Sequence, residues 1–486
     1  MKIRYSPKLL KFLIVIVSIV SCKKKDTQEP ELSVTPTAIT FPAEGGTMDL
    51  SLTCNAGWNI TNPVSSWLQL SETSGNSGST TIHLSTSGNG TGSTLSGILT
   101  INSSNGQSRR VTVSQPATIY PSYNTTPKAP DATGMSSTAV QLAANIKLGI
   151  NIGNTMEADG GETGWGNPVI TQSLIDLMKQ NGFNAIRIPC AWNLHVDDAA
   201  TAHISTAWLN RVKQVVQYCI NDGMYVVLNI HWDGGWLEQN CTELKKDSVN
   251  AKQKAFWEQI ATNLRDFDEH LMFASANEPN ATTAAQTAVL KSYHATFINA
   301  VRATGGKNSY RTLVLQAPST STDLAVQYMT TLPVDPVANK LMIEVHYYTP
   351  PNFCLLATDA SWGNMFYYWG TNYHSTTDPS RNSTFGEESY VDATFRTMKT
   401  NFVDRGIPVV LGEFAAIRRG NLTGDSLTLH LASRSHYYRY VTQQAKANGM
   451  LPFLWDVGYT DGIFNRQTNT IFDQQALDSL RVGAGL

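Results

Sequence analysis

The sequence predicts an α/β fold, a (β/α)8 TIM barrel preceded by a small all-β, immunoglobulin-like sandwich domain. Three observations predict it. From residue 136 to the end, eight apolar, β-rich runs alternate with amphipathic stretches. Before them lies a Ser-, Thr- and Gly-rich segment of short alternating runs. Finally, most of the eight runs end in polar or aromatic residues, at the strand ends where barrel sites form.

The first 22 residues are expected to be a signal peptide. Basic residues precede the apolar run "FLIVIVSIV" (12–20), which is too short to span a bilayer. The run ends in "IVSC", which resembles a bacterial lipobox whose Cys22 is lipidated and becomes the mature N-terminus. The alternative is an ordinary cleavable signal. Either way, we expect export.

Residues 23–31 are charged and contain no apolar residue, so we expect a tether between lipid and fold. We expect an outer-membrane lipoprotein at the cell surface. Surface lipoproteins of Bacteroidetes often carry acidic residues just after the lipidated cysteine, whereas this chain has Lys23, Lys24 and Lys25 there. The periplasmic face therefore stays an alternative.

Residues 32–117 contain short alternating runs such as "TMDLSLT", "TTIHLST" and "RVTVSQ", typical of a β-sandwich. The segments "AGWNI", "SSWLQLSETSGNSG" and "VTVSQ" resemble the BACON domain of Bacteroidetes proteins. Trp58 and Trp67 would serve as core residues or as a sugar platform, and their strand-like context favours the core. We expect a spacer rather than a glycan-binding module.

Residues 118–135 are rich in Pro, Ser, Thr and Gly and are expected to be a linker. The barrel is expected over 136–486. Stretches 171–182 and 208–223 are amphipathic and end in Asn-Gly and Asp-Gly, a helix stop signal. The alternative, a doubly wound open sheet, lacks its dinucleotide fingerprint, because "GINIGN" has the wrong spacing.

The expected barrel strands are eight apolar runs: "KLGINIGN", "NAIRIPCAW", "MYVVLNIHWD", "LMFASANEP", "RTLVLQAP", "LMIEVHYYTP", "IPVVLGEF" and "LPFLWD". Five cysteines besides Cys22 show no metal spacing, and we interpret them mainly as small buried residues. A net charge of −2 creates no field that would attract nucleic acid. We expect a monomer without a cofactor.

Two glutamates stand out at the strand ends. Glu278 follows the fourth run and Glu413 ends the seventh, so both would face the mouth of a barrel. Paired carboxylates suit glycosidic bond cleavage, which needs a proton on the leaving oxygen and a nucleophile at the anomeric carbon. The alternative is a metal site that also uses His231 and His346. Arg187 argues against it, because a fixed cation competes with a metal.

Six ordered motifs, "NAIRIP", "NIHWDGGW", "SANEPN", "IEVHYY", "VVLGEF" and "PFLWD", resemble glycoside hydrolase family 5. The segment 153–168, "GNTMEA…ETGWGNP", resembles its subfamily 4 of endoglucanases and xyloglucanases. The resemblance implies that Glu278 is the general acid/base and Glu413 the nucleophile of a retaining mechanism.

The resemblance also implies roles for the surrounding residues. Arg187 and Tyr348 would hydrogen-bond Glu413 and favour its charged form, which leaves Glu278 as the protonated partner. His346 would sit beside Glu278 and help its re-protonation. The expected sugar contacts are Asn277 to the 2-hydroxyl, His231 to another hydroxyl, Trp455 as a stacking floor, and Asn154 and Trp165 on the glycone side.

The aromatic residues near the site include one departure from the family pattern. Many relatives have a second histidine after the position of His231, where this chain has Trp232. Trp232 and Trp236 would widen an aromatic surface, with Trp192 as a further candidate. Trp362 and Trp369 lie in a loop after the sixth strand and would either pack that loop or bind the leaving group.

The expected function is an exported, retaining endo-β-1,4-glucanase acting on plant cell-wall polysaccharide, with xyloglucan or mixed-linkage glucan as substrate. Activity on mannan or xylan is one alternative. A non-catalytic, glycan-binding surface lipoprotein is another, weakened by the presence of both glutamates and their polar neighbours.

Overall fold

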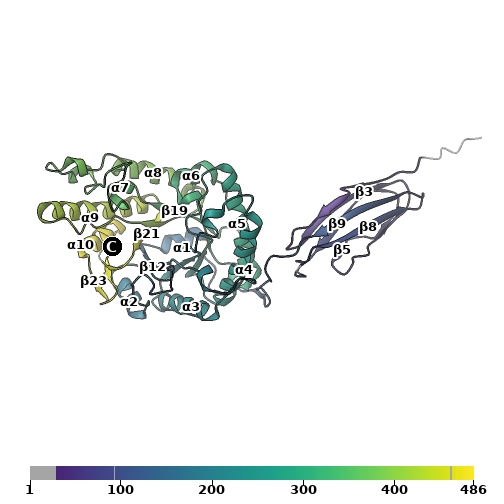
Figure 1. The fold of residues 1–486 in the computed structure, drawn as a ribbon, viewed down its shortest axis with the longest axis horizontal. Coiled ribbons are helices and arrows are strands. Elements are labelled where there is room, and N and C mark those ends of the chain that lie inside the picture. Colours follow the sequence, from purple (N-terminus) through teal and green to yellow (C-terminus); the bar gives the residue numbers. More distant parts are fainter. Residues whose placement is uncertain (1–28, 92, 460–461) are drawn as a thin grey trace, which may run out of the picture. The chain divides into compact units, whose positions relative to one another are not determined.

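A computed structural model describes residues 29–91, 93–459 and 462–486 and divides the chain into two compact units, with the boundary between Thr118 and Ile119 (Figure 1). The signal peptide, Cys22 and most of the expected tether lie outside the described residues. None of the described helices combines the length and apolar character needed to cross a bilayer.

The first unit is built from two β-sheets. One has the order β1-β3-β7-β5 and the other β2-β9-β8-β4-β6. Their strands are β1 (Leu32–Thr35), β2 (Ala38–Thr40), β3 (Gly46–Cys54), β4 (Trp58–Thr61), β5 (Leu68–Leu70), β6 (Ser74–Gly75), β7 (Gly78–Thr86), β8 (Leu95–Ser103) and β9 (Ser108–Gln115). Alternate residues such as Leu50 and Leu52 point into one apolar core. Trp58 is buried there and Trp67 packs against it, which confirms the core interpretation.

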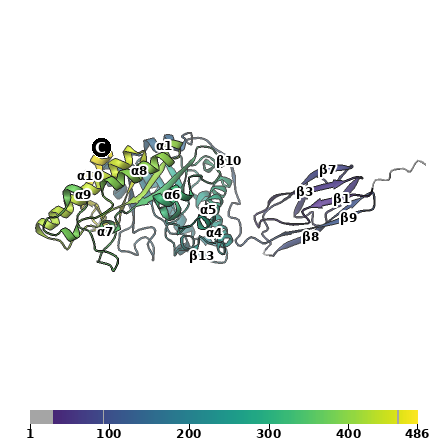
Figure 2. The ribbon, with the colours of Figure 1, turned by 90° about the horizontal axis from the view of Figure 1, so that it is seen from above.

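The second unit contains a closed barrel of eight parallel strands, so the predicted barrel is confirmed (Figures 1 and 2). In barrel order these are β11 (Gly149–Ile152), β12 (Ala185–Ile188), β15 (Tyr225–Asn229), β16 (Leu271–Ala274), β18 (Leu313–Gln316), β19 (Leu341–Tyr347), β20 (Val409–Phe414) and β21 (Met450–Asp456). The last strand pairs with the first, which closes the sheet. Each strand lies within one of the eight apolar runs or extends it by one residue.

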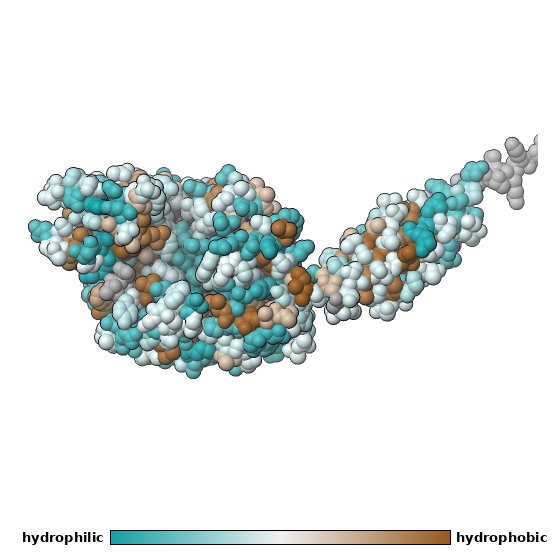
Figure 3. All heavy atoms as spheres, viewed as in Figure 1, coloured by the Kyte–Doolittle hydropathy of each residue, from teal (hydrophilic) through white to brown (hydrophobic). Residues whose placement is uncertain are grey.

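Helices surround the barrel on the outside (Figure 1), and hydrophilic and intermediate residues cover most of the face of this unit that Figure 3 shows. The helices are α2 (Gln172–Gln180), α3 (Thr206–Asn221), α4 (Lys246–Asn263), α5 (Ala284–Ala303), α6 (Thr322–Tyr328), α7 (Pro351–Cys354), α8 (Glu388–Asn401), α9 (Gly424–Ala447) and α10 (Gln474–Ala484). Gly182 and Gly223, just after α2 and α3, have positive φ, as expected for helix stops. Short pairs β13 (Val196–Asp198) with β14 (His203–Ile204), and β22 (Phe464–Asn465) with β23 (Thr470–Ile471), lie in connections.

Residues along each barrel strand alternate between two apolar cores. In β16, Leu271 and Phe273 pack outward against the helices, whereas Met272 and Ala274 point into the barrel. Helix α1 (Ala139–Asn145) contributes to the inner core and lies before the first strand. The inner core therefore fills the end of the barrel where the strands begin. The C-terminal ends of the strands remain for polar side chains.

The expected linker is wrong over residues 119–135, which pack on the barrel unit. Strand β10 (Lys128–Pro130) pairs in parallel with β17 (Gly305–Gly306). The main-chain N–H of Tyr123 donates to the Glu258 carboxylate, and Met135 is buried. The backbone of this segment finds hydrogen-bond partners in the barrel unit rather than in a longer helix or strand of its own. Its sequence therefore shows no regular apolar period.

Candidate active site

A layer of polar side chains lies above the inner core of the barrel. A strand repeats every two residues, so a polar residue two positions after an inward apolar residue also points inward. In β19, Met342, Glu344 and His346 follow this rule, and in β12 so do Ala185 and Arg187. The strands thus deliver charged groups to the barrel mouth, where barrel sites form.

Arg187 is fully buried at the centre of this layer. Its Nη1 donates to Asn151 Oδ1 at 2.9 Å and to Glu413 Oε1 at 2.8 Å. Its Nη2 donates to Asn277 Oδ1 at 2.8 Å and lies 2.9 Å from Glu344 Oε1. The guanidinium therefore fixes two carboxylates and two amides, a geometry that its planar fork suits.

Glu344 lies beneath the two glutamates that the sequence singles out. It is fully buried, and its Oε2 accepts a hydrogen bond from Gln316. A Cβ at Gly412 would lie 2.3 Å from Glu344 Oε1, so the glycine in "GEF" makes room for this carboxylate. Burial raises the pKa of Glu344, but Arg187 and His346 outweigh it and lower the pKa.

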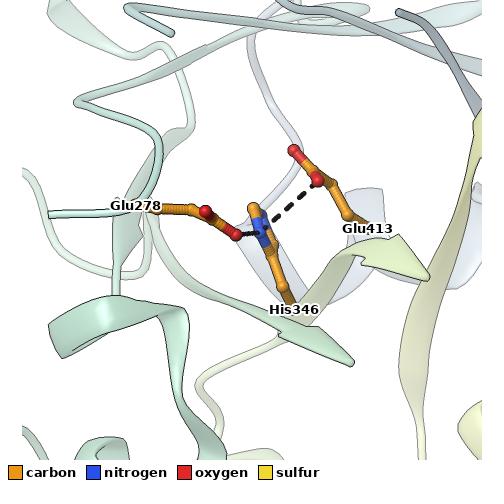
Figure 4. A group of neighbouring side chains, drawn as sticks. All are labelled: Glu278, His346 and Glu413. Carbon is orange, nitrogen blue, oxygen red and sulfur yellow. Dashed lines mark hydrogen bonds and ion pairs between the residues drawn. The ribbon is translucent and has the colours of Figure 1, made fainter. Parts of the chain in front are cut away.

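Glu278, His346 and Glu413 form a tight group at the mouth (Figure 4). His346 Nδ1 lies 2.7 Å from Glu278 Oε1 and 3.7 Å from Glu413 Oε2. One carboxylate oxygen of each glutamate and one ring nitrogen all lie within 4.8 Å of one another. Tyr348 donates its hydroxyl to Glu413 Oε2 at 2.8 Å. The contacts expected for Glu413 and His346 are therefore present.

The proton in this group sits on His346. Burial tends to lower the pKa of His346, but Glu413, Glu278 and Glu344 raise it to about 10. Both ring N–H groups then donate, one to Glu278 and the other to Glu344 Oε1 at 3.1 Å. The resulting imidazolium is a reservoir of one proton next to Glu278.

This proton position corrects the expected division of charge. Burial raises the pKa of Glu413, against the pull of His346 and Arg187. Partial burial also acts to raise the pKa of Glu278, but His346 outweighs it and the net pKa is lowered. In the free protein, Glu278 is therefore the ionised partner of His346. Its side chain is 47% exposed, so a ligand that covers it removes solvent from the carboxylate.

His231 and Trp455 form one wall of the site. Their rings are stacked at 5.6 Å with an interplanar angle of 8°. Burial, Arg187 and His346 lower the pKa of His231 well below its ordinary value, so the ring is neutral. Asn229 Oδ1 accepts from the Cys190 N–H, so its amide nitrogen donates to His231 Nδ1. His231 Nε2–H is then a hydrogen-bond donor.

Asn277 presents a defined group to the site. Its Oδ1 accepts from Arg187, so the amide nitrogen is the donor that remains, and Glu238 takes one of its hydrogens. Glu238, the first residue of the short helix η2 (Glu238–Asn240), also accepts the main-chain N–H of Glu278 at 2.8 Å. Burial raises the pKa of Glu238 to about 7. Glu238 thus holds the loop that carries both residues.

Asn154 and Trp165, predicted on the glycone side, and Trp232, predicted to widen the aromatic surface, are partly exposed. Trp165 and Trp232 expose about half of their surface. Asn154 has φ of 57°, and its main-chain N–H donates to Glu157. Burial raises the pKa of Glu157 to about 7. These positions leave two indole rings available to a ligand.

Two other tryptophans, Trp236 and Trp192, correct the predicted aromatic surface. Trp236 donates its indole N–H to Asp233 and packs edge-on against Phe256, so it supports its loop. Trp192 is fully buried. Trp369 is also fully buried, which agrees with the loop-packing alternative for this residue. Trp362 is 65% exposed. Large aromatic rings at strand ends and in long loops fill core gaps as readily as they bind sugars, and sequence position alone does not separate the two uses.

Sequence reasoning missed Glu344, Asn151 and Glu238. Two-residue spacing before His346 was a usable signal for Glu344, since both residues had to share the inner face of β19. Asn151 likewise lies on the inner face of its strand, β11, and its Nδ2 donates to Gly412 O and Leu454 O. Glu238 is in a loop, and no periodicity marks it.

The geometry of the site also tests the alternative of a metal site. Glu278, His346 and Glu413 are close enough to hold an ion, whereas His231 is not part of that group among the described residues. However, a protonated His346 offers no lone pair, and Arg187 already neutralises Glu413. The donor set does not fit a resident metal.

Family models match both units. One described as cellulase (glycosyl hydrolase family 5) matches residues 150–461, and one described as viral BACON domain matches residues 31–118. A xyloglucan-specific endo-β-1,4-glucanase from Bacteroides ovatus is 33% identical over 493 residues, covering 97% of this chain and 96% of its own. Endoglucanase A from Paenibacillus barcinonensis is 34% identical over 384 residues, covering 73% and 92%.

Similar solved structures belong to the same family. A Bacteroides ovatus family 5 xyloglucanase in complex with a XXXG heptasaccharide superposes with a TM-score of 0.71 at 33% identity, covering 94% of this chain and 100% of its own. A xyloglucan-specific β-1,4-glucanase from a ruminal metagenomic library, in complex with XXLG, reaches a TM-score of 0.67 at 40% identity, covering 72% and 96%.

Proposed function

The chain belongs to glycosyl hydrolase family 5, and we propose that it is a retaining endo-β-1,4-glucanase that cleaves β-glucans of the plant cell wall, with xyloglucan or mixed-linkage glucan as its principal substrate. Membership of a glycosidase family makes hydrolysis of a glycosidic bond the reaction to be explained. The residues that would carry it are Glu278, Glu413 and His346.

The observation that carries the mechanism is the close approach of the two carboxylates. Oxygens of Glu278 and Glu413 lie within 4.8 Å of each other. An inverting enzyme separates its carboxyl groups by about 6.5–9.5 Å to admit a water, whereas a retaining enzyme holds them at about 5–5.5 Å. The spacing supports direct attack by one carboxylate on the sugar.

In the first step, Glu413 attacks the anomeric carbon while Glu278 protonates the leaving oxygen. Substrate covers the exposed face of Glu278, which raises its pKa and draws the proton from His346. The bond to the leaving oxygen breaks as the bond to Glu413 forms. Arg187 and Tyr348 hold the attacking carboxylate in one orientation.

In the second step, Glu278 acts as the base. It takes a proton from a water that attacks the anomeric carbon, and Glu413 leaves as a carboxylate. The Asn277 amide and the His231 Nε2–H donate to hydroxyls of the sugar that Trp455 supports. Donors held in place in this way stabilise the charge that develops on the ring.

Xyloglucan is supported as substrate by two kinds of observation. Trp165 and Trp232 present exposed rings that suit the flat, equatorially substituted faces of glucosyl residues. A similar protein from Bacteroides ovatus is named a xyloglucan-specific endo-β-1,4-glucanase, and two similar solved structures are xyloglucan-cleaving enzymes in complex with XXXG and XXLG. An endoglucanase that cleaves xyloglucan must accept branches on the glucan main chain, whereas the bond that it cleaves is unchanged.

A polysaccharide panel with product analysis tests this function. We expect fast cleavage of xyloglucan or mixed-linkage glucan, slower cleavage of a soluble cellulose derivative, and least of mannan and xylan. Viscosity should fall faster than reducing ends accumulate, as endo cleavage requires. Glu413→Gln protein is the matched inactive control. Mannan or xylan as the best substrate, or no hydrolysis at all, would contradict the proposal.

We also propose that the enzyme is an exported lipoprotein anchored through Cys22, with the first unit acting as a spacer. The basis is the apolar run and the "IVSC" motif. Cys22→Ala should move the protein from membrane to soluble fractions. Protease treatment of intact cells should remove the enzyme if it is on the surface, and full resistance would place it in the periplasm.

A further inference from the structure

A third carboxylate, Glu238, lies beside the acid/base, and the two chemical steps described above do not use it. It is the first residue of η2, in the connection after β15, and only 6% of its surface is exposed. Its Oε1 accepts the main-chain N–H of Glu278 at 2.8 Å, and its main-chain oxygen accepts the N–H of Asn280 at 2.8 Å. Glu238 therefore contacts the segment that carries Glu278 through both its side chain and its backbone.

The same carboxylate completes a chain of hydrogen bonds through Asn277. Arg187 Nη2 donates to Asn277 Oδ1 at 2.8 Å, and the Asn277 amide nitrogen donates to Glu238. The amide is thus held at both ends, with one N–H left for a sugar hydroxyl. An ionised Glu238 accepts from both the Asn277 amide and the Glu278 main chain, whereas a protonated one would turn one oxygen into a donor. These two contacts therefore favour the charged form of Glu238.

The connection that carries Glu238 is itself fixed on both sides of this residue. Before it, the Asp233 carboxylate accepts the main-chain N–H of Trp192 at 2.8 Å, which joins the connection to the segment after β12. After it, the Tyr293 hydroxyl on α5 donates to Asn240 O at 2.8 Å. Functional groups are held most precisely when a second layer of contacts locks the residues that support them. Glu238 therefore projects from a rigid support.

The charged neighbours of Glu238 are carboxylates. Burial is the main cause that raises the pKa of Glu238 to about 7, and Glu278 and Glu413 add to it. The other titratable groups around it are neutral or face elsewhere: His231, whose pKa is lowered well below its ordinary value, Cys241 and Tyr293, whose pKa values are raised, and Lys252 and Asp233, which attract each other. None of the described cations forms an ion pair with Glu238, and Arg187 reaches it only through the Asn277 amide.

The repulsion between Glu238 and Glu278 affects where the stored proton goes. Of the charged groups that act on Glu238, Glu278 acts most strongly, because Glu238 contacts its main chain. The repulsion is mutual, so an ionised Glu238 makes a proton on Glu278 more favourable. Its effect on the imidazolium of His346 is smaller. The charge of Glu238 therefore favours transfer of the proton from His346 to Glu278 when a substrate arrives.

We propose that Glu238 is a positioning residue of the reaction, which orients the Asn277 amide toward the sugar and whose negative charge moves the stored proton toward Glu278. This inference rests on the proposed function and adds a determinant to it. Both effects act in the transition state, where the contact to the 2-hydroxyl strengthens and the leaving oxygen takes the proton. Loss of Glu238 should therefore lower kcat more than it raises KM.

Glu238→Gln tests the inference, because it keeps the size of the side chain and an oxygen that can accept the Glu278 N–H. On the polysaccharide that wild type cleaves best, kcat should fall about tenfold while KM stays within about twofold. The alkaline limb of the kcat profile should move by about one pH unit toward lower pH, because Glu278 loses its proton more easily without the nearby charge. An aryl glycoside whose phenol needs no proton should lose less activity.

Two further variants separate charge from shape. Glu243→Gln is the matched control, because it removes the same charge from an exposed glutamate near the same connection, which pairs with Lys246. It should change neither kcat nor the alkaline limb. Glu238→Asp keeps the charge on a shorter side chain, so it should lower kcat and leave the alkaline limb in place.

Three results for Glu238→Gln would overturn the inference: a wild-type kcat, a change in KM alone, or a lower kcat with an unmoved alkaline limb. The last is the result that a merely structural role gives. If Glu238→Gln does not fold, Glu238→Asp decides, and a wild-type kcat or a displaced alkaline limb would then overturn the inference. Wild-type protein inactive on every polysaccharide would instead overturn the proposed function on which the inference rests.

Discussion

Nδ1 of His346 lies 2.7 Å from Oε1 of Glu278, and this short contact joins a buried imidazolium to a half-exposed carboxylate. The pair holds one proton near neutral pH, stored on the histidine in the free protein. A carboxylate that acts first as acid needs a neighbour that supplies a proton, and after it has acted as base it needs the same neighbour to take a proton back. The relationship therefore explains why an ionised Glu278 suits the proposed reaction.

The stored proton predicts a pH dependence of stability. The pKa of His346 is about 10 in the folded protein, above its ordinary value of 6.5. Its contribution to stability is therefore fully present below about pH 6.5 and is lost as pH rises through 10. The free energy of unfolding of wild type should fall over this window relative to His346→Gln, by up to about 1.4 kcal/mol per pH unit. Denaturant titrations at several pH values measure it, and parallel curves would contradict it.

Arg187 should be a major stabilising residue as well as a positioning one. Arg187→Met leaves the buried Glu344 and Glu413 with only the His346 imidazolium to balance them, and removing one partner of a buried ion pair typically costs about 3–5 kcal/mol. The free energy of unfolding of Arg187→Lys should lie between those of wild type and Arg187→Met, because an ammonium keeps the charge but does not reproduce the planar fork of the guanidinium. Urea unfolding measures both. Adding Glu344→Gln to Arg187→Met should recover part of the loss. A decrease of less than about 0.5 kcal/mol in the free energy of unfolding of Arg187→Met would contradict this prediction.

Metal removal should leave activity intact. The protonated His346 and the Arg187 contact to Glu413 oppose a cation between the two glutamates. Dialysis against EDTA should therefore not change kcat on xyloglucan, with a buffer-dialysed sample as control. Loss of activity restored by added zinc would assign Glu278, His346 and Glu413 to ligand roles.

Glu278→Ala should separate the two chemical steps by substrate. Loss of the general acid should lower kcat/KM on polysaccharide by about 10²–10⁴-fold. An aryl glycoside whose phenol leaves without a proton should still undergo the first step and give a burst of phenol. Glu278→Gln serves as a second variant of the same size. Wild-type rates on polysaccharide would contradict the assignment.

Much of the fold could be predicted because it depends on local pattern. The eight apolar runs became the eight barrel strands, and Glu278 and Glu413 follow from their places after the fourth strand and at the end of the seventh. The five cysteines among the described residues are buried and form no disulfide with one another, as expected for small core residues. In each case, the signal is contained in a few adjacent residues.

What could not be predicted depends on contacts between distant segments. The proton on His346 requires Glu344, which needs the side-chain register of β19 together with the space left by Gly412. Residues 119–135 pair with Gly305–Gly306 and with α4, and no sequence pattern encodes those partners. Trp369 is buried because Ser433 on α9 accepts its backbone N–H and Gly386 its indole N–H.

The most direct test of the central claim is to find the residue that becomes glycosylated. A 2-deoxy-2-fluoro aryl cellobioside slows both steps while its leaving group still permits the first, so a covalent intermediate should accumulate. Mass spectrometry of the digested protein should then place the sugar on the peptide that contains Glu413. The sugar on the Glu278 peptide, or α-configured sugar as the first product of normal hydrolysis, would contradict the account.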